Sequence, residues 1–185
     1  MDKSRAKAPA EAFDDTAAID DRARNVLVHL TGSEIDQCLI REAGTYVTGT
    51  GGKLVLVNTM APNEFMERQQ AHAQIDHLPT YTICQAEESC RQHALKRGRQ
   101  ALVAFGIDYT AVGMVGRETD SLLTTAQQYD CGHLFLGDQQ QSLLRRFTAL
   151  SFSQVITRKF DGLVTVLRSA RDEGKSNKRR WTMQG

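Results

Sequence analysis

Two glycine-containing segments of this sequence have the composition of nucleotide-binding or phosphate-binding loops. Thr31-Gly32-Ser33 follows one short apolar run, and residues 137–140 (Gly-Asp-Gln-Gln) follow another. A glycine lets backbone amides approach a ligand closely. Ser142 begins a predicted helix whose free N–H groups can hold an anion, with Arg145 and Arg146 nearby. Turn and cap residues without any ligand are an equally good interpretation, because turns of this kind favour Gly and Ser.

Other catalytic chemistries lack a matching motif. The sequence contains no Gly-x-Ser-x-Gly elbow and no Walker lysine loop. Glu34 and Asp138 flank the two loops and suit paired carboxylates for acid–base catalysis, but solvated loop charges are the better interpretation. His29 and His133 lie in apolar runs, which favours core histidines bonded to neighbours over catalytic bases. We therefore predict no catalytic residues.

The cysteines and histidines give no metal-binding pattern. The four cysteines form no Cys-x-x-Cys pair, and the five histidines are scattered along the chain. A structural zinc site or a disulfide framework is therefore not expected. We predict no bound metal and reduced, mostly buried thiols.

Composition limits the possible partners and the cellular location. The 185 residues include 23 Lys and Arg and 22 Asp and Glu, giving a net charge of +1 without the surplus typical of nucleic-acid binding. The longest apolar stretch, residues 101–107, is far shorter than the roughly 20 residues that cross a bilayer. Residues 1–5 are charged and not followed by an apolar signal segment. We expect a cytoplasmic protein with no membrane or nucleic-acid partner.

The loops must be positioned by alternating strands and helices. Helical patterns are expected after Ser33, which is predicted to cap the first helix, over 82–105, over 118–130 and from Ser142 onward. Residues 61–80 are polar with two prolines and are interpreted as a mobile excursion with a single helical turn. The expected strands are 26–30, 54–57, 109–115, 133–136 and 163–167.

Apolar strands alternating with helices predict an α/β fold with a parallel sheet covered on both faces, a doubly wound Rossmann-like sandwich. In such a sheet ligands bind beyond the carboxyl ends of the strands. We predict a single domain over residues 24–168, with a flexible N-terminal tail over 1–23 and a basic C-terminal tail over 169–185.

Segments spread over residues 24–168 resemble, in order and spacing, the universal stress protein family. Val26 to Glu34 (VLVHLTGSE) resembles its opening strand, where hydrophobic residues usually precede Asp-Gly-Ser-Glu. The resemblance implies a five-stranded parallel sheet with strand order 3-2-1-4-5 in a three-layer sandwich. The other matching segments are 116–117, 131–137 (CGHLFLG), 151–156 and 163–167.

The sequence departs from the family's ATP-binding pattern, which is Gly-x-x-Gly, nine residues, then Gly-Ser/Thr. Gly137 and Ser151 match its first and last positions, but Gln140 and Leu150 replace two glycines. A Cβ at these places obstructs the approach of backbone to phosphate oxygens. The resemblance therefore implies a member that has lost ATP binding or binds ATP weakly.

The resemblance also assigns candidate nucleotide contacts near the first loop. Thr31 stands where the family's nucleotide-contacting aspartate usually lies, and Val57 matches its aliphatic adenine-side position. The complete candidate nucleotide-binding set is Thr31, Gly32, Val57, Gly137, Gln140 and Ser151.

The last strand is the surface where we expect a partner to bind. With strand order 3-2-1-4-5 it forms an exposed apolar edge, which a second copy can cover about a two-fold axis. Many members of the family dimerise this way, so we predict a homodimer. The candidate interface residues are Leu163, Val164, Thr165, Val166 and Leu167.

The expected function is a non-catalytic stress-response or regulatory module that acts through homodimerisation and contacts with an unknown protein partner, without a cofactor. Two alternatives stay open. One is an ATP- or AMP-binding switch that uses ATP with magnesium and a variant phosphate loop, with or without slow hydrolysis. The other is binding of a different small ligand in the same crevice.

Overall fold

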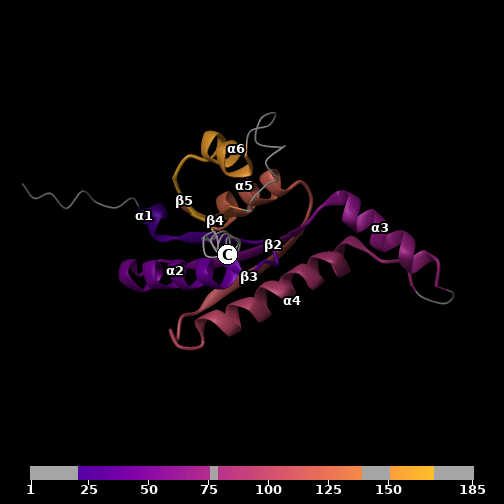
Figure 1. Ribbon diagram of the computed structural model, residues 1–185, viewed down its shortest axis with the longest axis horizontal. Coiled ribbons are helices and arrows are strands. Elements are labelled where there is room, and N and C mark those ends of the chain that lie inside the picture. The colour runs from indigo at the N-terminus through magenta and orange to yellow at the C-terminus, as the bar shows by residue number, and fades with distance from the viewer. Residues whose placement is uncertain (1–20, 76–78, 139–150, 169–185) are drawn as a thin grey trace, which may run out of the picture.

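A five-stranded parallel sheet forms the centre of the computed structural model, which describes residues 21–75, 79–138 and 151–168. The strand order is β3-β2-β1-β4-β5, as the sequence analysis predicted (Figure 1). All four strand pairs are parallel. The strands are β1 (Val26–Leu30), β2 (Leu54–Met60), β3 (Tyr109–Val115), β4 (His133–Asp138) and β5 (Leu163–Arg168).

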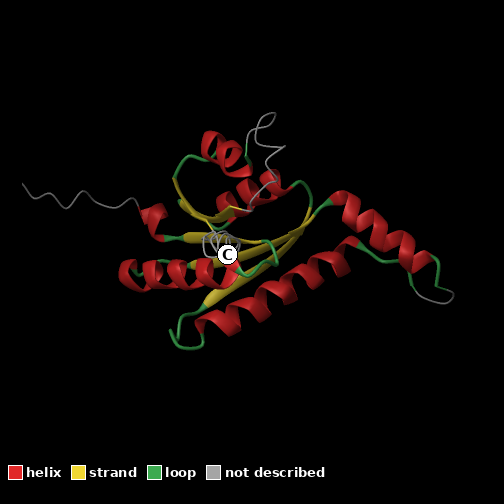
Figure 2. Cartoon of the chain, viewed as in Figure 1, coloured by secondary structure: helices red, strands yellow, loops and turns green. Residues whose placement is uncertain are grey.

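Helices cover both faces of the sheet and give three layers (Figure 2). Helices α2 (Ile35–Thr50) and α4 (Ile83–Leu102) lie on one face, and α5 (Glu118–Gln128) and α6 (Phe152–Lys159) lie on the other. The short α1 (Asp21–Arg24) precedes β1. Helix α3 (Pro62–Ala73) projects from the body together with the start of α4. The architecture is the α/β Rossmann-like sandwich expected from the sequence.

The core lies on both faces of the central strand β1, whose five residues are all buried. Val26, Val28 and Leu30 pack toward α2 and α4, whereas Leu27 packs toward α5 and α6. A parallel strand covered by helices on both faces needs side chains suited to burial at every position, which explains why four of its five residues are apolar. In α2 apolar residues recur at every fourth position, and Leu39, Ala43 and Val47 are buried.

Residues just before β1 are hydrogen-bonded into the fold. The Gly132 amide donates to the Arg22 carbonyl at 2.7 Å, and the Tyr46 hydroxyl donates to the Ala23 carbonyl at 3.1 Å. The Arg22 guanidinium also pairs with Asp130 at 2.8 Å. A side chain at Gly132 would meet the backbone of Arg22 at 2.7 Å, so this glycine permits the close approach.

The interpretation of residues 61–80 as an excursion with a single helical turn is wrong. Residues 62–73 form α3, a helix of 12 residues. Pro62 occupies the first turn, where its missing N–H costs nothing and its fixed φ suits the helix. Phe65 is buried against Tyr81, and Glu64 pairs with Arg68 one turn later at 2.8 Å. The proline begins the helix here rather than excluding one.

One predicted helix start also changes, and a second lies outside the described residues. Helix α2 begins after Glu34 without a side-chain cap, so Ser33 is not the cap that was predicted. Residues 139–150 lie outside the described part of the chain, but Ser151 has extended backbone and caps α6. Ser151 itself is therefore not helical, and the predicted start at Ser142 is not among the described residues. The Ser151 hydroxyl accepts from the Gln154 backbone amide at 3.3 Å, and the Ser151 backbone amide donates to Gln154 Oε1 at 3.0 Å.

The cysteines are all free, but only Cys90 and Cys131 are buried. Cys38 and Cys84 are exposed, so the prediction of mostly buried thiols holds for half of them. Burial raises the pKa of the Cys131 thiol to about 12 and also raises the pKa of Cys90. Within residues 21–75, 79–138 and 151–168, no helix combines the length and apolarity needed to cross a bilayer.

Candidate functional site

The candidate site lies at the carboxyl edge of β2, β1 and β4, the position at which open parallel sheets bind ligands. Thr31 and Gly32 directly follow β1, and Val57 lies beside His29 in the register of β1 and β2. Gly137 lies near the end of β4. Phe152, the residue after Ser151, contacts the His29 ring with centroids 5.5 Å apart, which brings the start of α6 to this edge. Gln140 and Leu150 lie outside the described residues.

A buried carboxylate fills the loop between β1 and α2. Asp36 is fully buried, and its Oδ2 accepts from the Gly32 amide at 2.9 Å. Its Oδ1 accepts from the Thr31 amide at 3.2 Å and from the Thr31 hydroxyl at 3.3 Å. These amides are the groups that a βα loop can present to a ligand phosphate. In this protein an internal anion already uses them.

The structure gives Gly137 a packing role. A Cβ on Gly137 would lie 2.9 Å from Ile35 Cγ2 and 3.3 Å from Leu39 Cδ1. The glycine therefore lets α2 pack closely on β4, whereas the sequence suggested approach to a ligand. Val57 is likewise fully buried in the core between the sheet and α5, so its side chain is not presented to solvent.

His29 forms a polar cluster on the face of the sheet that α5 and α6 cover. It is buried, and its Nε2 lies 3.1 Å from Glu118 Oε1 and 3.5 Å from Thr59 Oγ1. Burial lowers the pKa of His29 to about 4 and raises the pKa of Glu118. A neutral His29 donates from Nε2 to the Glu118 carboxylate. This confirms the interpretation as a core histidine with bonded neighbours.

A cavity of about 310 Å³ opens beside the candidate crevice on the α2 and α4 face. Thr31 and Gly32 form one side of it, and residues 58–60 at the end of β2 form another. The remaining walls come from α3 and the middle of α4. Those helix residues are Glu64, Arg68, Ser89, Cys90 and His93.

Sequence reasoning missed most of these residues. Asp36 was not recognised as an internal anion, although a carboxylate five residues after Thr31 was a usable signal. Glu64 and Arg68 were missed because their segment was predicted as a loop. Their i,i+4 spacing after a proline was the signal for a helix. Among residues whose placement is described, no group of three or more His, Cys, Asp or Glu could hold a metal ion.

Comparison with solved structures identifies the fold. The hypothetical protein MJ0577 matches with a TM-score of 0.60 and 12% identity, over 81% of this chain and 99% of that one. A universal stress protein in complex with cAMP matches with a TM-score of 0.54 and 16% identity, over 79% and 97%. The universal stress protein UspA from Lactobacillus plantarum matches with a TM-score of 0.54 and 16% identity, over 80% and 99%.

These similarities are structural. No protein-family model and no curated protein matches the sequence. At the identities found, the likeness concerns the fold. The chain has the universal stress protein fold, with the strand order that its sequence resemblance implied.

Proposed function

We propose that this protein is a universal stress protein-like, non-catalytic regulatory module that acts through homodimerisation and contacts with a protein partner, and that it has lost ATP binding. The observation that carries the loss of ATP binding is the buried Asp36 carboxylate, which accepts from the Thr31 and Gly32 amides. A nucleotide phosphate at this loop would meet a fixed negative charge instead of free N–H donors. The replacements Gln140 and Leu150 act in the same direction.

Calorimetric titration with ATP and magnesium tests this proposal. The wild-type protein is expected to show no binding tighter than about 100 μM, between the micromolar and millimolar levels of affinity. The double variant Gln140→Gly/Leu150→Gly restores the glycine pattern. A gain of ATP affinity in that variant supports the steric account, whereas tight binding by the wild type contradicts the proposed loss.

The proposed dimer uses the edge of the sheet. β5 lies at one end of the strand order, and β4 is its one neighbour within the described sheet. Leu163 is 53% exposed at the start of β5. Exposed edge strands are usually covered, and pairing with the same strand of a second copy covers both.

A nucleotide-binding switch is the second candidate function, and one comparison favours it. A universal stress protein with this fold is in complex with cAMP. A cyclic monophosphate carries less charge than ATP and makes smaller demands on a phosphate loop. Titration with cAMP and AMP alongside ATP separates this candidate from the main proposal, because the switch requires that one of them bind.

A further inference from the structure

The cavity between α3 and α4 has a charge pattern suited to a ligand different from a nucleotide. Glu64 and Arg68 both line it, and Arg68 Nη2 donates to Glu64 Oε1 at 2.8 Å. The hydrogen bond to Glu64 raises the pKa of Arg68, so its positive charge persists. A guanidinium has five N–H donors, and one of them is used in this bond. Each partner therefore keeps hydrogen-bonding capacity for a ligand.

The walls away from α3 are polar and contain no Asp, Glu, Lys or Arg side chain. Ser89 and His93 come from α4, and Asn58 comes from the end of β2. The Asn58 amide donates to the Leu30 carbonyl at 3.0 Å, which orients the side chain and leaves its oxygen as an acceptor. Met60 and Cys90 are buried and give the cavity an apolar base.

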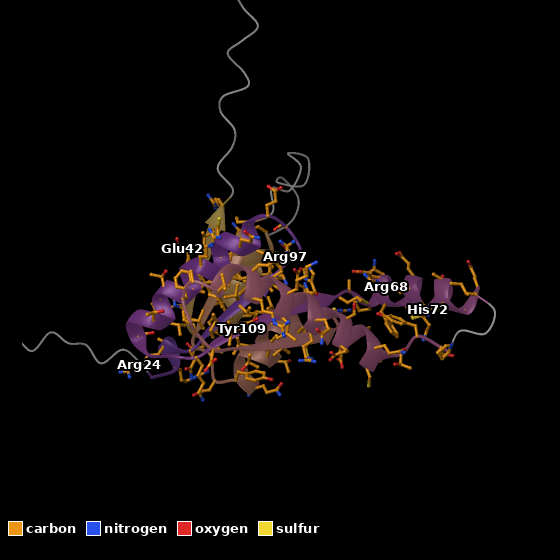
Figure 3. The ribbon with its side chains drawn as sticks, turned by 90° about the horizontal axis from the view of Figure 1, so that it is seen from below. Arg24, Glu42, Arg68, His72, Arg97 and Tyr109 are labelled. Atoms are coloured by element: carbon orange, nitrogen blue, oxygen red, sulfur yellow. The ribbon has the colours of Figure 1, made fainter. Side chains whose placement is uncertain are left out.

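The walls are held in fixed relation to one another. Arg97 of α4 donates to the Gly32 carbonyl at 2.8 Å, which joins α4 to the loop after β1. On the other side, Phe65 of α3 packs against Tyr81, and Gln69 donates to the Tyr81 carbonyl at 3.1 Å. Figure 3 shows Arg68 and His72 on the projecting α3 and Arg97 nearer the body of the protein. The cavity is thus built by contacts from three sides.

Size and charge select the class of ligand. A volume of about 310 Å³ lies at the low end for small-molecule pockets. The fixed charges are one carboxylate and one guanidinium, so a polyanion would gain one cation but face Glu64. A ligand with one positive and one negative group can pair with both.

We propose that this cavity binds a free α-amino acid, with its carboxylate paired to Arg68 and its ammonium group paired to Glu64. The apolar base formed by Met60 and Cys90 favours an uncharged aliphatic side chain. The site shares Thr31 and Gly32 with the candidate nucleotide crevice but uses neither β4 nor α6. It does not depend on the proposed dimer or on the proposed loss of ATP binding.

Titration of the full chain, followed by NMR, tests the charge requirement with four probes. They are L-leucine, N-acetyl-L-leucine, which lacks the positive charge, L-leucinamide, which lacks the negative charge, and ATP with magnesium. The proposal expects saturable binding of leucine and at least about tenfold weaker binding of both single-charge analogues, since a hydrogen bond to a charged group contributes about 1.5–3 kcal/mol.

Matched variants locate the binding. Glu64→Gln and Arg68→Gln are each expected to weaken leucine binding about tenfold or more. Glu88→Gln and Arg91→Gln change a similar ion pair on α4 that does not line the cavity, and they should leave binding unchanged. Thermal unfolding of every variant checks that the fold is retained.

Three results would overturn the amino-acid site. They are absence of leucine binding by the folded wild type, equal binding of leucine and N-acetyl-leucine, or leucine binding that the two cavity variants leave unchanged. Binding of ATP alone would overturn both this site and the proposed loss of ATP binding. Absence of all binding would overturn this site alone and leave the proposed function standing.

Discussion

Asp36 accepts a 2.9 Å hydrogen bond from the backbone amide of Gly32, and this bond joins the first turn of α2 to the loop that ends β1. Gly32 has a φ of 81°, a conformation that residues with a Cβ rarely adopt. Gly32, the residue with the positive φ, is in the same loop whose backbone amides donate to the Asp36 carboxylate. A side chain of the protein itself, Asp36, therefore stabilises this loop.

Replacing Asp36 by Ala is expected to lower the free energy of unfolding by about 1–3 kcal/mol. The change removes the charged acceptor of the partly buried Thr31 and Gly32 amides, and losing hydrogen bonds to a charged group costs about that amount. Urea denaturation followed by circular dichroism measures the effect. Glu34→Ala is the control, because Glu34 is exposed and makes no capping bond. Equal stability of the two variants would show that the carboxylate does not hold the loop.

Stability should fall as the pH decreases from about 6.5 to 4, and His29 should be a main cause. The pKa of His29 is about 4 in the folded protein and about 6.5 in the unfolded chain. In this interval the unfolded state binds a proton that the folded state does not, so unfolding becomes more favourable. The contribution is present in full above pH 6.5 and amounts to about 3 kcal/mol.

Urea midpoints measured across this pH range test the role of His29. His29→Gln should show a flatter dependence than the wild type, because the titrating group is gone. Glu118→Gln is the companion variant, since the raised pKa of Glu118 opposes the His29 effect. Removing Glu118 should leave the acid destabilisation in place. An unchanged slope in His29→Gln would assign the pH dependence to other groups.

Two glycine-to-alanine changes in helices should have opposite effects. Helix propensity alone favours Ala over Gly by up to about 1 kcal/mol. At Gly49 in α2 no atom other than the adjoining residues and backbone of the same helix lies within 4 Å of the place that an added methyl group would take, so Gly49→Ala should stabilise the protein. At Gly98 in α4 a Cβ would lie 2.7 Å from Leu56 and 2.5 Å from the Tyr109 ring.

Gly98→Ala should therefore lower the free energy of unfolding by about 1–3 kcal/mol through overpacking. The Tyr109 hydroxyl donates to the Leu95 carbonyl at 2.9 Å, which holds the ring in place. Thermal or urea unfolding of both variants provides the comparison. If Gly98→Ala were as stable as Gly49→Ala, the close packing of α4 on β2 and β3 would not limit this position.

If two copies pair through β5 as proposed, positive charges introduced on this strand should separate them. Leu163→Lys/Val166→Lys introduces two positive charges on each edge strand, and like charges would face each other across the interface. Light scattering should show twice the chain mass for the wild type and the chain mass for the variant. Thr110→Lys is the control, because Thr110 is exposed on β3 at the other edge. A monomeric wild type at high micromolar concentration would contradict the dimer.

The sheet could be predicted from the sequence because each buried strand is an apolar run between helical patterns. Residues 26–30 and 54–57 are examples, and their burial needs no knowledge of distant contacts. Helix α3 was missed because proline was taken as a breaker, although at the first turn it favours a helix. Gly98 shows a similar limit. A glycine inside a helix ordinarily weakens it, but Tyr109 and Leu56 require the absence of a side chain there.

The position of the candidate residues at the edge of the sheet could be predicted, but the hydrogen-bond partners and charges around them could not. Thr31, Gly32 and Gly137 do lie at the carboxyl edge of the sheet, since parallel strands bring their ends together. The partners of the loop amides could not be inferred, because they depend on where the Asp36 side chain turns. The cavity depends on Arg68 and His93, which come from different helices that meet only in the folded chain.

The hydrogen bonds to the Arg22 and Ala23 carbonyls determine where the polypeptide can be cut without harm. A protease that cleaved after Arg24 would remove the acceptors of the Gly132 amide and the Tyr46 hydroxyl, together with the Asp130 ion pair. Those groups lie on the segment before β4, on α2 and in the turn after α5. A fragment intended to fold by itself should therefore begin at or before Asp21.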